Sequence, residues 1–372
     1  MMTTKGLYIH IPFCKRKCAY CDFCSSADFD GELTERYIRA VLAEAAEYGR
    51  DEKIPIDTLY LGGGTPSLLS LSQLEMLLAG LDKYFDILPD AERTIEVNPG
   101  TMTESKARGY KALGFNRVSV GLQSVHENEL KKLGRIHTFG DFLHSYAILR
   151  HAGFDNISID LMYGIPEQTR DSFSSTLDTV LSLFPEHISV YGLIVEEGTP
   201  FFEQRDMLPL PDEDAECDMY YLAHGKLTSH GYSHYEISNY AQDGHKSRHN
   251  LKYWRAEEYI GLGLSAYSYF EGRRYGNGRD MSSYLDGCYM SEDDGAVDNE
   301  QAAYEYTMMH LRLSEGIFLS DYEHRFGQKF TDGREQKIEE YIRLGLMDIS
   351  DGRLFLTHRG FYVSNHILVN IL

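Results

Sequence analysis

Cys14-Lys15-Arg16-Lys17-Cys18-Ala19-Tyr20-Cys21-Asp22-Phe23-Cys24 is the stretch that decides the interpretation of this chain. It holds four of the six cysteines of the chain within eleven positions. Cys14, Cys18 and Cys21 are separated by three and then by two residues, a spacing that can hold three irons of a [4Fe–4S] cluster. The fourth iron then stays open and can chelate a small molecule. The loop therefore predicts a redox cofactor and a co-substrate bound to it.

A structural zinc site is the alternative interpretation of the same loop. Zinc usually takes two ligand pairs separated by a longer spacer, which lets four thiolates surround the ion. The remaining cysteines, Cys217 and Cys288, are isolated and far apart in sequence, so no second pair exists. Cys24 could close the open iron as a fourth ligand. We expect its side chain to point elsewhere, because a strand-like backbone after Cys21 would turn it away from the cluster.

Length, composition and net charge limit the classes of protein to which this chain can belong. The 372 residues suffice for one large α/β domain and a smaller one, and 42% apolar with 25% charged residues is ordinary for a soluble globular protein. A formal net charge of −21 disfavours nucleic acid as the main partner. No stretch reaches the roughly 20 apolar residues of a membrane span, and the first residues lack the apolar region of a signal peptide. We therefore expect a cytoplasmic protein without an integral membrane segment.

Short apolar runs alternate with helical stretches along the first 200 residues. The predicted strands span 7–11, 58–61, 93–97, 117–121, 156–161 and 187–191, and the clearest helices span 33–48 and 71–84. This alternation favours βαβ units and a parallel sheet. Six units fit an α/β fold with a partial (β/α)6 barrel better than a closed barrel of eight. In either form, functional residues gather at the carboxyl ends of the strands.

The composition changes near the acidic stretch 291–295. Beyond it, 302–313 and 334–344 have helical spacing, and 345–357 has the pattern of a small hairpin. These features predict a small C-terminal domain of helical, winged-helix-like type. We place the boundary so that 1–290 forms the core and 291–372 forms the C-terminal domain.

Polar residues and glycines follow successive predicted strands. They are Gly63, Gly64 and Thr65 in a glycine loop, then Glu96, Gln123 and Asp160, with Arg135 in a nearby loop. Glycines let the backbone approach a ligand closely, a carboxylate can accept from ribose hydroxyls, and an arginine can pair with a carboxylate. Each residue alone is more often an ordinary turn or surface group, but together they indicate one ligand site.

With these residues in order, the sequence resembles the HemN/HemW group of radical S-adenosylmethionine (SAM) proteins over nearly its whole length. The resemblance implies that Cys14, Cys18 and Cys21 hold a [4Fe–4S] cluster. It also implies that one or two SAM molecules are surrounded by Tyr8, Phe23, Gly63, Gly64, Thr65, Glu96, Gln123, Arg135 and Asp160.

Two features separate the branches of this group. Phe23 stands two positions after the third cysteine, where the decarboxylating HemN enzymes have a further cysteine, and the N-terminal extension of those enzymes is not present before the loop. The segment His249-Asn250-Leu251-Lys252-Tyr253-Trp254 matches the His-Asn-x-x-Tyr-Trp pattern of the HemW branch. That resemblance implies haem as a ligand, with His249 on the iron and Tyr253 and Trp254 against the macrocycle. His245 and His234 are alternative axial ligands.

The leading hypothesis is a haem chaperone that binds haem, a [4Fe–4S] cluster and SAM and passes haem to an acceptor protein. It also requires an electron donor, and it leaves a homodimer open. The alternative is an oxygen-independent coproporphyrinogen III dehydrogenase, which would oxidatively decarboxylate its substrate by radical SAM chemistry. A radical SAM enzyme acting on haem itself and a zinc-stabilised binding module are the remaining hypotheses.

Overall fold

The computed structural model describes residues 4–372, and its centre is a sheet of six parallel strands. The six strands are β1 (Lys5–Ile11), β2 (Ile54–Gly63), β3 (Phe85–Val97), β4 (Arg117–Gln123), β5 (Ile157–Tyr163) and β6 (His187–Gly192). They neighbour one another in sequence order, and every adjacent pair is parallel. This arrangement confirms the α/β fold predicted from the alternating sequence pattern.

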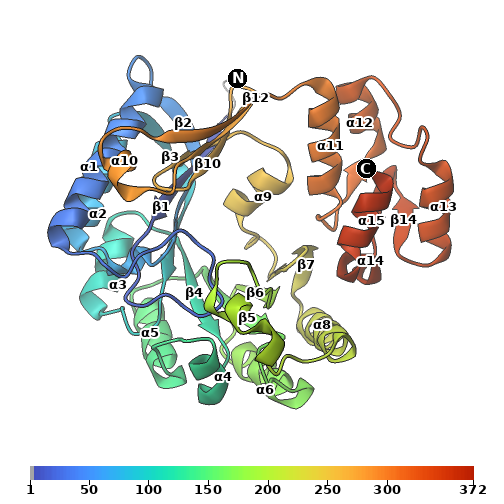
Figure 1. Cartoon of the computed structure of the whole chain (residues 1–372), viewed down its shortest axis with the longest axis horizontal. Helices are drawn as coiled ribbons and strands as arrows, with labels where there is room; N and C mark the ends of the chain where they lie inside the picture. Colours follow the sequence, from blue (N-terminus) through green and yellow to red (C-terminus); the bar gives the residue numbers. More distant parts are fainter. Residues whose placement is uncertain (1–3) are drawn as a thin grey trace.

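Helices connect the successive parallel strands and cover one face of the sheet (Figure 1). They are α1 (Gly31–Gly49), α2 (Leu71–Leu81), α3 (Glu104–Ala112), α4 (Glu127–Lys132), α5 (Phe139–His151) and α6 (Arg170–Leu181), and α7 (Pro200–Glu203) and α8 (Glu213–Ser229) follow β6. Short 3₁₀ turns lie at Pro66–Leu68 and Arg205–Met207. Except for α4, these helices begin at a residue whose side chain caps the helix: Asp30 accepts from the backbone N–H of Leu33, and Ser70 forms a capping box with Gln73.

Side chains of each parallel strand alternate between two environments. On β1, Leu7, Ile9 and Ile11 are fully buried in the core shared with the helices. Successive side chains of a strand point to opposite faces, so Tyr8 and His10 lie on the inner face. The other parallel strands repeat this pattern, which gives the barrel an apolar outer layer and a polar interior.

The six strands do not close on themselves. β1 pairs in parallel with a further strand, β9, and β6 pairs antiparallel with β8. The extension strands are β7 (Ser233–Glu236), β8 (Asn239–Ala241), β9 (Tyr259–Leu262), β10 (Tyr267–Phe270), β11 (Arg273–Asn277) and β12 (Met290–Ala296), with helices α9 (Arg248–Trp254) and α10 (Met281–Leu285) between them. The predicted partial barrel is therefore confirmed, and the sheet is extended on both sides to twelve strands.

The C-terminal part forms a separate lobe in Figure 1 with its own hydrophobic cluster. It consists of α11 (Asn299–His310), β13 (Ile317–Phe318), α12 (Leu319–Phe326), α13 (Glu335–Arg343), β14 (Met347–Ser350), β15 (Arg353–Leu356), α14 (His358–Tyr362) and α15 (Ser364–Ile371). β14 and β15 form the predicted hairpin, and β13 pairs with β15. The acidic stretch 291–295, where the composition changes, lies in β12, whose backbone pairs with β11. The domain boundary before residue 291 stays a proposal.

Glu44 of α1 fastens the sheet extension to the core. Its buried carboxylate accepts hydrogen bonds from the backbone N–H of Gly263 (2.9 Å), from the amide of Asn277 (2.6 Å) and from the hydroxyl of Tyr284. Gly263 directly follows β9, Asn277 ends β11 and Tyr284 lies in α10. One carboxylate therefore fixes the extension against the first helix. Within residues 4–372, no helix has the length and apolarity that a membrane span requires.

We expect Glu44→Ala to lower the free energy of unfolding by about 2–4 kcal/mol, because three buried donors lose their acceptor. Urea denaturation followed by circular dichroism measures the change. Glu47→Ala, three residues along the same helix and exposed, is the matched control. Equal stabilities of the two variants would contradict this role of Glu44.

Candidate cofactor site

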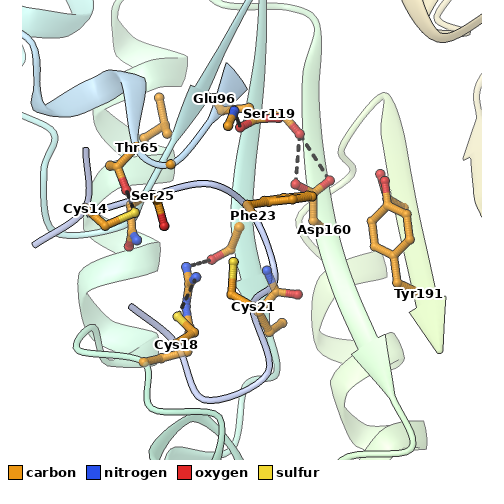
Figure 2. A pocket seen from close by; sticks show the side chains of 18 of the residues that line it. Cys14, Cys18, Cys21, Phe23, Ser25, Thr65, Glu96, Ser119, Asp160 and Tyr191 are labelled. Atoms are coloured by element: carbon orange, nitrogen blue, oxygen red, sulfur yellow. Dashed lines mark hydrogen bonds between the residues drawn. The ribbon is translucent and has the colours of Figure 1, made fainter. Parts of the chain in front are cut away.

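A cavity of about 310 Å³ lies at the carboxyl ends of the parallel strands, beneath the cysteine loop. Figure 2 shows Cys14 beside Thr65 on one side of this main cavity, and Asp160 with Ser119 and Tyr191 on the other. Eleven of the residues predicted from the sequence line it: Cys14, Cys18, Cys21, Phe23, Gly63, Gly64, Thr65, Glu96, Gln123, Arg135 and Asp160. Residues more than 140 positions apart in sequence thus share one cavity.

Two of the three predicted cluster cysteines, Cys14 and Cys18, receive contacts from donors outside the cysteine loop. The Thr65 hydroxyl lies 3.5 Å from the Cys14 sulfur, and an Arg135 guanidinium nitrogen lies 3.7 Å from the Cys18 sulfur. Positive charge and hydrogen-bond donors stabilise thiolate over thiol. Among residues 4–372, no group of three His, Cys, Asp or Glu side chains converges on a point where it could hold a single metal ion.

The glycine loop has no room for larger residues. Gly63 adopts a φ of +106°, and a Cβ there would lie 2.5 Å from the His10 ring. A Cβ on Gly64 would lie 2.8 Å from the backbone oxygens of Ile11 and Phe13. The loop therefore packs directly under the start of the cysteine loop, with its backbone N–H groups close to the cavity.

Glu96 is held on the inner face of β3. Its carboxylate accepts from the Tyr60 hydroxyl (2.8 Å) and from the backbone N–H of Gly63 (3.1 Å). Burial, with a smaller contribution from the neighbouring Asp160, raises the pKa of Glu96 to about 7 against the lowering effect of these hydrogen bonds. Near neutral pH this group can therefore hold either a proton or a negative charge.

Asp160 lies across the cavity on β5. It accepts from the Ser119 hydroxyl (2.9 Å) and from the Ser158 hydroxyl (3.3 Å), and its pKa is raised by burial. Ser158 also bonds His187, whose other ring nitrogen bonds Tyr235 at 2.8 Å. A connected polar network therefore forms the inner wall of the barrel.

Several polar atoms at the rim of the cavity have no partner in the described residues. The Oε1 atom of Gln123 and the Nε atom of Arg135 are buried without a hydrogen bond, and so is the Nε atom of Arg117 in the interior. Gln123 also has a φ of +74° at a register shift between β4 and β5, a strained conformation for a residue other than glycine. Buried polar atoms are normally satisfied, so these positions fit a site that receives polar atoms from ligands.

Sequence reasoning missed part of the cavity lining. The residues not predicted include Tyr60, Arg117, Ser119, His187, Ser189, Tyr191 and Asn250. The available signal was polar residues at every second position of otherwise apolar strands, as in His187-Ile188-Ser189-Val190-Tyr191 of β6. Attention to the strand ends alone left these interior positions unnoticed.

Two predicted site residues, Tyr8 and His249, do not line the main cavity. The Tyr8 hydroxyl bonds the Nδ1 atom of His10 at 3.0 Å, and its side chain borders a second cavity beyond the edge of the barrel. Cys24 borders that second cavity as well and not the main one, which confirms that its side chain points away from the other cysteines. The reason differs from the predicted strand, because Cys24 lies in a bend.

His249 is buried at the start of α9, and both ring nitrogens have partners. Nδ1 lies 2.9 Å from the Thr58 hydroxyl, and Nε2 lies 2.7 Å from the Tyr253 hydroxyl. Burial lowers the pKa of His249 to about 3, so the imidazole is neutral. His249 as an axial haem ligand stays a prediction, and it requires one of these two hydrogen bonds to break.

Comparison with known proteins agrees with this geometry. The family model described as the radical SAM superfamily matches residues 8–180, and the HemN C-terminal domain matches residues 297–363. The heme chaperone HemW of Bacillus subtilis is 34% identical over 374 residues, which cover 98% of each chain. The HemW proteins of Synechocystis and Escherichia coli are 40% and 37% identical, and each covers 83% of this chain. The chain belongs to the HemW family of radical SAM proteins.

A solved structure shows the same fold. The coproporphyrinogen III oxidase HemN from Escherichia coli, described as a radical SAM enzyme, superposes with a TM-score of 0.86 at 23% identity. The match covers 99% of this chain and 90% of that one. Membership of the radical SAM superfamily implies a [4Fe–4S] cluster and SAM, and the cavity offers three thiols and unsatisfied polar atoms that fit them.

Substitution of any one of Cys14, Cys18 and Cys21 by Ala should abolish stable iron incorporation, whereas Cys24→Ser should keep about four irons per chain. The expected difference arises because only the first three thiols line the main cavity. Iron and acid-labile sulfide analysis after anaerobic reconstitution measures it. Loss of iron from Cys24→Ser together with retention in Cys21→Ala would reverse our assignment.

The raised pKa of Glu96 predicts a pH dependence of stability. Between pH 4.5 and pH 7, Glu96 is protonated in the folded state and ionised in the unfolded state. This difference stabilises the folded state fully at low pH, and the stabilisation is lost as the pH rises through this range. Glu96→Gln should reduce the fall in unfolding free energy between these pH values by on the order of 1–3 kcal/mol. Urea denaturation at several pH values measures the slope. The exposed variant Glu52→Gln should keep the wild-type slope, and an unchanged slope in Glu96→Gln would refute the prediction.

Proposed function

We propose that this chain is a haem chaperone that carries a [4Fe–4S] cluster and SAM, binds haem and passes it to an acceptor protein. The observation that carries the proposal is the similarity along nearly the full chain to proteins named heme chaperone HemW, one of them matched over 98% of both lengths. An electron donor, a homodimer and a cytoplasmic location belong to the same proposal.

Within the proposal, Cys14, Cys18 and Cys21 hold the cluster. Thr65 stabilises the thiolate of Cys14, and Arg135 stabilises the thiolate of Cys18. When bound, the cluster supplies a reducing electron and an open iron for the amino and carboxylate groups of SAM. The protein itself positions SAM and excludes water and oxygen from its surroundings.

Different polar residues of the main cavity bind different groups of SAM. Arg135 is already held by the backbone oxygen of Gly121 at 2.6 Å and offers its free Nε edge to a carboxylate. The carboxylate of Glu96, presented beside the glycine loop, accepts from ribose hydroxyls. When ionised, the carboxylates of Glu96 and Asp160 would attract the cationic sulfonium of SAM locally, in a cavity that four cationic side chains also line.

Anaerobic incubation of the cluster-loaded chain with haem, SAM and reductant tests this function. We expect equimolar binding of haem, recovery of haem intact, and transfer of haem to apomyoglobin as a probe acceptor. Coproporphyrinogen III in place of haem should remain undecarboxylated.

Protoporphyrinogen formation with consumption of SAM would establish the dehydrogenase instead. Failure of a cluster-loaded, folded preparation to bind haem would overturn the chaperone proposal.

A further inference from the structure

A second cavity, of about 470 Å³, lies next to the main cavity, and Phe23 lines both. It opens beyond the β1 edge of the barrel, where the cysteine loop faces the sheet extension. The Phe23 ring is 58% exposed, so it borders this space without filling it. The volume falls within the range of roughly 300–1,000 Å³ that is typical of small-molecule and cofactor sites.

Aromatic rings form much of the wall of the second cavity. Tyr8, Tyr253, Tyr259 and Tyr267 come from β1, α9, β9 and β10, and Phe23 comes from the cysteine loop. Tyr253 and Tyr259 pack edge to face, with ring centroids 4.5 Å apart. Five rings around one space suit a flat, apolar, aromatic ligand better than a polar metabolite.

His249 supports this wall from behind. Its ring stacks on Tyr60 at 5.1 Å between centroids, and its Nε2 atom holds the Tyr253 hydroxyl. His249 and Tyr253 are four residues apart on α9, which places them on one face of the helix. In this arrangement the histidine positions the tyrosine that faces the cavity.

Two side chains of the second cavity, those of His10 and Cys24, are of types that ligate iron, and only Cys24 lacks a short hydrogen bond. His10 uses Nδ1 for Tyr8 and Nε2 for the backbone oxygen of Cys24. The Cys24 sulfur, by contrast, has only a weak contact of 3.9 Å to the backbone oxygen of Arg279. Thiolate is an established axial ligand type for haem iron.

Asp22 is the one carboxylate residue and Arg279 the one arginine among the described residues that line this cavity. The Arg279 guanidinium donates to the backbone oxygen of Asp22 at 3.0 Å and forms no ion pair with a carboxylate among the described residues. A guanidinium without a carboxylate partner, beside an aromatic pocket, matches a flat ligand that carries carboxylates on its rim.

From this geometry, and resting on the proposed haem-chaperone function, we infer that the second cavity is the haem site, with Cys24 as axial ligand and Arg279 paired with a propionate. The Cys24 thiol loses its proton to solvent as the sulfur–iron bond forms, and the iron keeps its oxidation state. Phe23 and the tyrosines pack against the macrocycle, which brings haem next to the cluster loop.

Haem titration of the cluster-loaded full chain tests the inference. Cys24→Ser should weaken haem binding by more than about tenfold and remove the spectroscopic signature of thiolate ligation, read from the Soret band of the ferrous carbonyl complex. Cys288→Ser, which changes an exposed cysteine outside the cavity, should bind as wild type. Iron content and thermal unfolding of each variant show that the fold and the cluster are intact.

Haem dimethyl ester, which lacks the propionate charges, separates the role of Arg279. Arg279→Gln should weaken haem binding several-fold and leave binding of the ester unchanged, whereas the exposed control Arg50→Gln should affect neither. Equal loss of both ligands in Arg279→Gln would overturn the propionate contact.

Alkylation of Cys24 provides a measurement that needs no variant. Haem bound in the second cavity should protect the Cys24 thiol from iodoacetamide and leave the exposed Cys288 reactive.

If the wild type binds haem but Cys24→Ser keeps its spectrum and affinity while His249→Ala loses them, the axial ligand is His249 and this inference is wrong. If the wild type binds no haem, the proposed function itself fails.

Discussion

The pairing register of the six parallel strands is the constraint on which the site depends. Glu96 pairs with Ser119 across β3 and β4, and Gly121 pairs with Asp160 across β4 and β5. Because side chains alternate along each strand, this register puts the polar residues of all these strands on one face. A slip of one residue would send Glu96 and Asp160 into the apolar layer beneath the helices. The fold and the cavity are therefore specified by the same hydrogen-bond ladder.

A polar barrel interior is costly unless its groups bond one another. Hydrogen bonds from Tyr60, Ser119 and Ser158 offset that cost for the buried carboxylates of Glu96 and Asp160. The unsatisfied atoms of Gln123, Arg135 and Arg117 are exceptions within an otherwise connected network. All three residues line the main cavity, where a bound ligand can supply the missing partners.

The two cavities share the cysteine loop but differ in chemistry. The main cavity has thiols, glycines and carboxylates, which suit a cluster and a cationic co-substrate. The second cavity has aromatic rings, one free thiol and one arginine. The wall between them includes Phe23 and the side of the barrel that carries Tyr8, which stacks near Tyr60 and His249. Haem in the second cavity would lie against the cysteine loop. A change in this loop when SAM binds or when the cluster is reduced would therefore alter the haem site and couple haem release to that event.

The sequence by itself determined the order of strands and helices and the partial barrel, and it predicted the cluster cysteines and eleven of the residues that line the main cavity. Alternating hydrophobicity and residue spacing are local properties, and the carboxyl ends of parallel strands meet by geometry. It did not reveal that Tyr8 borders the second cavity instead of the main one, that both nitrogens of His249 are bonded, or that Cys24 and Arg279 share a cavity. Those facts arise from contacts between segments as distant as Cys24 and Arg279, which lie 255 residues apart. Only tertiary packing decides which atoms are already satisfied and which remain free for a ligand.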